Sequence, residues 1–309
     1  MTAAVTGATG YVGRFIVDRL IEEGVAVRAW RRKNSDLRGM PSGVEWIEGD
    51  LASSDAADAL LDGADMLVHA ALEHQPGRYR GGAGGDLAGY LQTNVAGSLT
   101  LLAKARKGGV KRCVVISSRA VFGEAARTGP LFDEEPPRPD THYGAAKAAL
   151  EAFVQSFGHE GWPVAALRPT GVYGVVVPAE KSKWFDLVAR ALKREPVEAR
   201  AGTEVHGRDV ADAVWRLLKA PTAEVCGRAF NCSDIVVSTR DIVRLVHRAA
   251  EMSGPLPRPA PVPVNVMAHE GLDRLGIVLG GRPLLEETIA KLVAAVQGRG
   301  DVLRQSDAS

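Results

Sequence analysis

The sequence predicts an α/β protein built on a Rossmann-type doubly wound parallel sheet, with a smaller C-terminal substrate-binding lobe. Two observations predict this fold. In the first half of the 309 residues, short apolar runs alternate with longer segments of helical periodicity. The run KRCVVISS at 111–118 is apolar throughout its centre, which is typical of a strand covered on both faces. Such alternation gives parallel strands joined by right-handed crossovers, with helices on both faces of the sheet.

The same periodicity predicts the individual elements. Strands are expected at 3–6, 25–30 and 44–48, within 64–71 and 111–118, and at 164–169. Helices are expected at 11–23, which Gly24 ends as a C-cap, and at 87–107 and 141–157. After Pro169 the alternation breaks. The remaining expectations are helices at 184–194, 208–219 and 284–296, a helix capped by Ser238 that runs to about 252, and a strand within 228–234.

Alternating prolines between 255 and 263 exclude a helix there. They indicate an extended connector, with docking to a partner domain as the alternative. We expect residues 1–170 to form the Rossmann-type domain, to which 203–232 return. Residues 171–202 and 233–309 are expected to form the smaller lobe.

The bulk properties exclude several classes of protein. The net charge of +1 provides no basic field for nucleic acid or an anionic membrane. No apolar run reaches the roughly 18 residues of a membrane helix, and strand-like sequence begins at Ala3, where a signal peptide would lie. Cys113, Cys226 and Cys232 lack metal or redox spacing and are expected to be reduced. We therefore expect a cytoplasmic protein without nucleic-acid or membrane partners.

The segment VTGATGYVG lies between the first strand and the first helix. Gly7 would allow the tight turn, Gly10 would let the backbone approach a pyrophosphate, and Gly13 would let the helix pack closely. The first N–H groups of a helix lack intrahelical partners and attract phosphate. This context predicts a dinucleotide site, with a plain glycine-rich turn as the alternative.

The second strand ends in AWRRK, where an acid would bind the ribose 2′-hydroxyl of NAD. Arg31, Arg32 and Lys33 stand there instead, and guanidinium groups suit a 2′-phosphate. We therefore favour NADP over NAD, the alternative being a solvated basic strand end. Asp50 follows the third strand and could hold the adenine amino group.

The segment YGAAK places Tyr143 and Lys147 four residues apart, on one face of a predicted helix. The phenol of a free tyrosine, with a pKa of about 10, is a poor base at neutral pH. A lysine charge favours the phenolate and brings it toward a usable range. Ser118 ends the fifth strand and could bond the same substrate oxygen while hydride passes to or from a nicotinamide.

Together, GATGYVG, Asp50, HAA at 69–71, TNVAGS, ISSRAVFG, YGAAK and LRPTGVYG resemble the extended short-chain dehydrogenase/reductases. This NAD(P)-dependent epimerase/dehydratase family includes nucleotide-sugar epimerases, and the resemblance is strong over 3–175. It implies a homodimer and a catalytic set of Ser118, Tyr143 and Lys147. The residues expected at the cofactor are Gly7, Thr9, Gly10, Tyr11, Val12, Gly13, Arg31, Arg32, Asp50, Leu51, Ala70, Ala71, Asn94, Tyr143 and Lys147.

One departure bears on the reaction. The family's 4,6-dehydratases carry an Asp-Glu pair after the catalytic hydroxyl residue, where this chain has Arg119 and Ala120. A dehydratase is therefore disfavoured, and hydride transfer at a hydroxyl or carbonyl carbon of a nucleotide sugar is expected. An NADPH-dependent carbonyl reductase of a small non-nucleotide substrate and a non-catalytic NADP-binding regulator are the alternatives.

The expected substrate contacts are Arg78, Arg80, Arg119 and Arg208. Arg119 would meet a carboxylate or phosphate, or else form a surface ion pair. The glycine-rich loop 75–86 would be a flap that offers arginines to an anionic substrate, or else a plain exposed loop. His69 is expected to pack, and no metal site is expected because His206 and Asp209 lack a third ligand at credible spacing.

Overall fold

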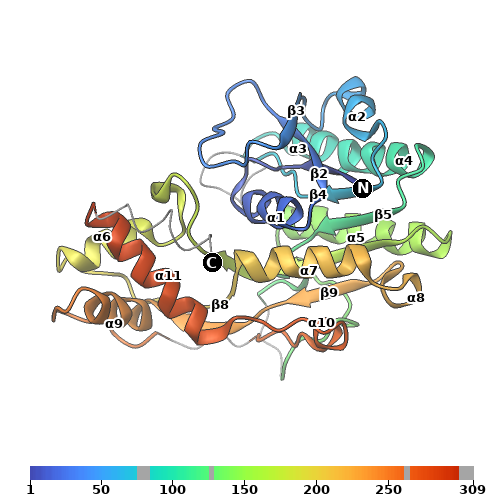
Figure 1. Ribbon diagram of the computed structural model, residues 1–309. Coiled ribbons are helices and arrows are strands. Elements are labelled where there is room, and N and C mark those ends of the chain that lie inside the picture. The colour runs from blue at the N-terminus through green and yellow to red at the C-terminus, as the bar shows by residue number, and fades with distance from the viewer. Residues whose placement is uncertain (75–83, 125–128, 261–264, 299–309) are drawn as a thin grey trace.

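The computed structural model describes residues 1–74, 84–124, 129–260 and 265–298. A seven-stranded sheet with the order β3-β2-β1-β4-β5-β6-β9 forms its centre (Figure 1). Every neighbouring pair in this sheet is parallel. The strands are β1 (Thr2–Thr6), β2 (Ala26–Arg31), β3 (Val44–Glu48), β4 (Met66–His69), β5 (Arg112–Ile116), β6 (Val164–Pro169) and β9 (Ala229–Cys232). The order reverses between β1 and β4, which confirms the doubly wound sheet.

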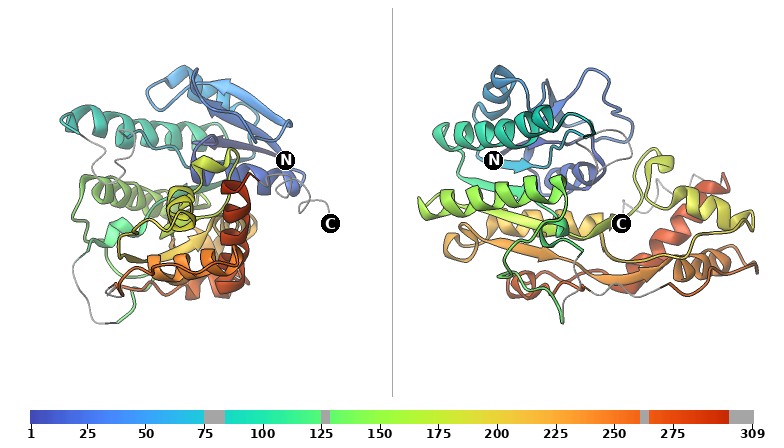
Figure 2. Two further views of the ribbon diagram at one scale, coloured as in Figure 1. Left: turned by 90° about the vertical axis from the view of Figure 1, so that its left-hand side faces the viewer. Right: turned by 180° about the vertical axis from the view of Figure 1, so that it is seen from behind.

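Helices cover both faces of this sheet because its central strands, such as β4 and β5, are apolar on both sides. One face carries α1 (Tyr11–Glu22) and α7 (Gly207–Lys219), in front of the sheet in Figure 1. The other carries α2 (Ser54–Leu61), α4 (Ser98–Lys107) and α5 (His142–His159); α4 and α5 are in front in the rear view of Figure 2. A buried apolar core lies on each side of the sheet.

A second body of structure lies at the lower left of Figure 1. Its three-stranded sheet has the order β10-β8-β7, and a third apolar core joins its helices. The strands are β7 (Gly171–Tyr173), β8 (Ala201–His206) and β10 (Ile235–Ser238). The helices are α6 (Phe185–Leu192), α9 (Thr239–Ala249) and α11 (Gly281–Val296). The short helices α8 (Thr222–Val225) and α10 (Glu270–Arg274) lie nearer the large sheet.

Most predicted elements are confirmed within a few residues, and Ser238 caps α9 in a capping box with Asp241. The helix expected at 87–107 is divided into α3 (Leu87–Leu91), a π-helical turn η1 (Gln92–Gly97) and α4. Residues 255–260 are non-helical, as expected, and 261–264 lie outside the described residues. No helix in the described part of the chain is long and apolar enough to cross a membrane.

Candidate functional site

A cavity of about 1200 Å³ lies at the carboxyl ends of the parallel strands and reaches β7 and β8 of the smaller body. Its volume exceeds the roughly 300–1,000 Å³ of pockets for single drug-sized ligands. The switch point of a doubly wound sheet is where such folds bind ligands. The wall comes from six stretches of chain at the carboxyl ends of β1 to β6, from Tyr143 and Lys147, and from Lys181, Lys183 and 201–204.

The glycine turn after β1 forms one wall of the cavity. Gly7 has a φ of +69°, and a Cβ there would lie 2.6 Å from the backbone of Ala70. A Cβ on Gly13 would lie 2.1 Å from the Gly7 carbonyl oxygen, so the start of α1 packs directly on the turn. Gly10 is the N-cap of α1 and brings no capping side chain, so the helix end is left open to an anion. Thr9, Gly10, Tyr11, Val12 and Gly13 all line the cavity.

The basic end of β2 contributes one of its two arginines to the cavity. Arg32 lines it, together with Asn34, Ser35 and Asp36, whereas Arg31 is the last residue of β2 and does not. The Ser35 Oγ accepts the Arg32 N–H at 2.9 Å, and the Ser35 N–H bonds the Arg32 carbonyl at 2.9 Å. This closed turn fixes Arg32 at the cavity. Asp50 and Leu51, after β3, line the same end.

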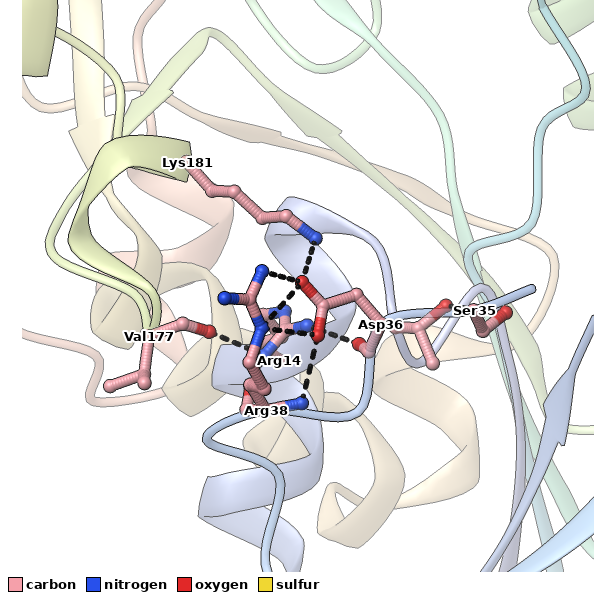
Figure 3. Close-up of polar contacts among 7 residues, drawn as sticks. Arg14, Ser35, Asp36, Arg38, Val177 and Lys181 are labelled. Atoms are coloured by element: carbon pink, nitrogen blue, oxygen red, sulfur yellow. Dashed lines mark hydrogen bonds and ion pairs between the residues drawn. The ribbon is translucent and has the colours of Figure 1, made fainter.

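A polar clasp joins the loop after β2 to the segment after β7 (Figure 3). The buried Arg14 guanidinium donates to the backbone carbonyls of Asp36 (2.6 Å), Arg38 (2.5 Å) and Val177 (2.8 Å). The Asp36 carboxylate accepts from Arg38 and, at 2.7 Å, from Lys181. These cations, Arg38 first, hold the pKa of Asp36 far below its usual range. The clasp therefore ties the smaller body to the rim of the cavity.

The residues expected to be catalytic meet at the opposite end of the cavity. Ser118 follows β5 and accepts the Ala120 N–H at 3.1 Å at the start of the short 3₁₀ helix η2 (Arg119–Phe122). Tyr143 lies in the first turn of α5, whose N-cap Thr141 accepts the Gly144 N–H at 3.1 Å. A Cβ on Gly144 would lie 2.3 Å from the Ala120 carbonyl oxygen, so glycine lets α5 pack directly on η2. Both Ser118 and Tyr143 line the cavity.

Lys147 lies one turn beyond Tyr143 on α5 and is 4% exposed. Its ammonium donates to the Ile116 carbonyl at 2.7 Å. Burial lowers its pKa to about 8, although the Glu151 carboxylate nearby opposes the shift. Lys147 also lines the cavity. A cation with a pKa this close to neutrality can both stabilise a phenolate and exchange a proton.

The remaining cofactor candidates divide into two groups. Ala70 and Ala71 line the cavity, and their N–H groups bond the Thr6 hydroxyl at 3.2 and 3.1 Å. Asn94 does not line it; its amide instead binds the Glu73 N–H and carbonyl oxygen and the Tyr90 carbonyl oxygen. Asn94 therefore positions the chain after β4 from within the π-helical turn η1.

His69 has the packing role that was expected. Its ring is fully buried between the hydroxyls of Thr6 and Ser98, at 2.8 and 2.9 Å. Burial first, and then the charge of Lys147, lowers its pKa to about 3, so the ring is neutral.

The four substrate candidates have different positions. Arg119 lines the cavity and is ion-paired with Glu124 at 3.3 Å. Arg208 does not line it; it is exposed and lies 3.6 Å from Glu287. Arg78 and Arg80 lie outside the described residues.

His206 and Asp209 each accept a backbone hydrogen bond. The His206 Nδ1 accepts the Arg208 N–H at 3.0 Å as the N-cap of α7, and Asp209 accepts the Gly280 N–H at 3.1 Å. Among the described residues there is no group of three or more His, Cys, Asp or Glu side chains that could hold a metal ion.

Three features of the cavity were not predicted from the sequence. They are the Asp36–Lys181 link, the ion pair of Lys183 with Glu204, and the buried hydroxyl of Thr170. Each pair joins residues far apart in the chain, so no local pattern marks it. Thr170 directly follows β6. Its position at the end of a strand is the sequence feature from which its place at the cavity could have been predicted.

The family model described as "NAD dependent epimerase/dehydratase family" matches residues 3–233. The UDP-glucose 4-epimerase of Streptomyces lividans is 31% identical over 154 residues, which cover 48% of this chain and 45% of that protein. The 3 beta-hydroxysteroid dehydrogenase/Delta 5-->4-isomerase of Mycobacterium tuberculosis (strain H37Rv) is 33% identical over 180 residues, which cover 55% and 46%. The chain thus spans about half the length of these curated relatives.

Among solved structures, the UDP-glucose 4-epimerase of Thermus thermophilus in complex with NAD is 25% identical to this chain. The two superpose with a TM-score of 0.78 over 96% of this chain and 99% of that one.

Proposed function

Because this chain belongs to the NAD dependent epimerase/dehydratase family, we propose that it is an NAD(P)-dependent oxidoreductase acting at a hydroxyl or carbonyl carbon. The observation that carries the proposal is the convergence of Ser118, Tyr143 and Lys147 on the cavity that begins at the glycine turn. Hydride transfer at such a carbon can give a net reduction, or it can be part of an epimerisation that passes through a ketone. A 4,6-dehydratase is disfavoured because Arg119 and Ala120 supply no acid and base for loss of water.

The residues present fit a dinucleotide. The uncapped N-terminus of α1 and the glycine turn would hold the pyrophosphate. Asp50 would bind the adenine. Arg32 would bind a 2′-phosphate by charge-assisted hydrogen bonds, which is why we favour NADP.

Tyr143 is the proposed acid and base. A bound reduced nicotinamide would supply the hydride for the carbonyl carbon and be oxidised in return, and Tyr143 would supply the proton for the carbonyl oxygen. Ser118 would hold the substrate oxygen beside the phenol. Lys147 would stabilise the phenolate by its charge while the Ile116 carbonyl holds the ammonium in place.

The test measures deuteride transfer from NADPH deuterated at C4 to a panel of ketones and nucleotide sugars. The wild type is compared with Tyr143→Phe. Removing a general acid should lower the rate by about 10²- to 10⁴-fold and leave NADPH binding intact. Wild-type protein that binds NADPH without any transfer would favour the non-catalytic regulator. Equal transfer by Tyr143→Phe would contradict the role of the phenol.

Two substrate classes fit this chemistry. The UDP-glucose 4-epimerase relatives support a nucleotide sugar. The hydroxysteroid dehydrogenase relative supports a substrate without a nucleotide.

A further inference from the structure

Charge distribution in the cavity distinguishes the two substrate classes. We define the substrate wall as those cavity-lining residues with polar or charged side chains that the proposed function leaves to the substrate. They are Glu73, His74, Arg119, Glu124, Thr170, Lys183, Thr203 and Glu204. Two cations thus face three carboxylates. A nucleotide sugar carries a diphosphate, which needs cations or free N–H groups to replace its lost hydration.

Lys183 is ion-paired with Glu204. The two side chains form a close ion pair, and Glu204 is 9% exposed on β8. Gly171 faces Glu204 in the β7–β8 register, and its missing side chain leaves room for this pair. Drawing Lys183 to a phosphate would leave a buried carboxylate without a counter-charge, which is strongly unfavourable.

Arg119 is also paired. Its side chain is 13% exposed and lies 3.3 Å from the Glu124 carboxylate. Three other lysine or arginine side chains line the cavity but serve other groups: Arg32 is assigned to the cofactor, Lys181 bonds Asp36 in the clasp, and Lys147 bonds Ile116. Each cation of the described substrate wall is therefore already matched by a carboxylate, and Glu73 adds a further negative charge.

The wall instead offers an uncharged donor. Thr170 is 8% exposed, lines the cavity, and its hydroxyl has no hydrogen-bond partner among the described residues. A buried hydroxyl without a partner is costly, so native structures seldom keep one unless something else bonds it. A hydroxyl or carbonyl group of a bound molecule would satisfy it.

We propose that the substrate is an uncharged alcohol or ketone without a phosphate group, which Thr170 binds through a neutral hydrogen bond. This inference rests on the proposed oxidoreductase function and selects among its substrates. The described residues of the substrate wall disfavour a diphosphate because their lysine and arginine side chains are held by carboxylates, and Glu204 is the carboxylate that holds Lys183.

The test is calorimetric titration, first with NADP⁺ and then with UDP as the diphosphate probe. On NADP⁺-saturated wild type, UDP should bind more weakly than a Kd of about 1 mM. Glu204→Gln keeps the size of the side chain and frees Lys183, so UDP should bind at least about tenfold more tightly to it. The matched control is Glu286→Gln, which removes a carboxylate paired with Arg248 outside the cavity and should leave UDP binding unchanged.

The outcomes separate the two proposals. Normal NADP⁺ binding followed by micromolar UDP binding to the wild type would overturn the inference alone. Unchanged UDP affinity in Glu204→Gln, or an equal gain in Glu286→Gln, would overturn it as well. Failure of both NADP⁺ and NAD⁺ to bind would overturn the proposed function and the inference with it.

Discussion

The ammonium of Lys147 donates a 2.7 Å hydrogen bond to the backbone carbonyl of Ile116, two residues before Ser118. The bond ties α5 to the carboxyl end of β5. Because Tyr143 lies one turn earlier on α5, the same bond sets the phenol and the serine hydroxyl at one end of the cavity. Lys147 thus links α5 to β5 and, in the proposed function, also supplies the positive charge that stabilises the Tyr143 phenolate.

This dual role predicts a pH dependence. The pKa of Lys147 is lowered to about 8, so the lysine loses its proton, and its support for the phenolate, as pH rises through that value. We expect kcat/KM for reduction to fall above a pH of about 8. Arginine stays charged above this pH, so the Lys147→Arg variant should not show this fall in kcat/KM. Its overall rate should nevertheless be lower than that of the wild type. If kcat/KM of Lys147→Arg fell at the same pH, the titrating group would be one other than Lys147.

The two arginines at the end of β2 should differ in their effect on cofactor choice. Arg32→Ala should weaken NADPH binding by about 10- to 100-fold, the loss of a charge-assisted bond, and leave NADH binding nearly unchanged. Arg31→Ala is the matched control and should change neither, because Arg31 does not line the cavity. Fluorescence titration of both variants measures this. A larger effect at Arg31 would contradict the assignment.

The clasp should contribute to stability through Arg14 in particular. Arg14→Met leaves three backbone carbonyls without their buried donor and should lower the free energy of unfolding by about 3–5 kcal/mol. Arg38→Met removes only an exposed cation from Asp36 and should change stability little. Urea unfolding compares the two. If both variants lost similar free energy of unfolding, the ion pairs of the Asp36 carboxylate, and not the carbonyls bonded by Arg14, would be what supports the clasp.

A second buried ion pair begins one turn beyond Lys147 on α5. Glu151 and Arg168 are 7% and 4% exposed, with their closest charged atoms 2.7 Å apart, and Glu151 also accepts the Ser117 hydroxyl. Glu151→Gln or Arg168→Met alone should cost about 3–5 kcal/mol because each leaves one buried charge unpaired. The double variant should lose much less than the sum of the two in denaturant unfolding. Strict additivity would mean that the pair does not act as a unit.

Local pattern predicted the parts of the site that depend on consecutive residues. The glycine turn and the Tyr143–Lys147 spacing follow from the periods of strand and helix, and the structure places both at the cavity. The local sequence pattern could not tell whether Arg31 or Arg32 lines the cavity, because this depends on the turn that Ser35 closes with Arg32. The helix α2 could have been predicted from its N-cap Ser53, whose hydroxyl accepts the Ala56 N–H.

Other features could not have been predicted locally. The strands β7 and β10 have three and four residues and acquire their conformation by pairing with β8. The substrate wall joins residues that follow β4 and β6, residues in and after η2, Lys183 before α6, and β8, so its charge balance depends on the folded chain. Asn94 was expected at the cofactor from its motif, but its side chain instead bonds the backbone of Glu73 from within the π-helical turn.

The central claim is that the cavity binds NADP as the cofactor of an oxidoreductase. The most direct measurement is equilibrium titration of the wild type with NADPH and with NADH, followed by quenching of tryptophan fluorescence, since Trp30 lines the cavity. We predict saturable binding of NADPH that is at least about tenfold tighter than that of NADH. Binding of neither dinucleotide would contradict the claim, and tighter binding of NADH would contradict the assignment of Arg32 to a 2′-phosphate.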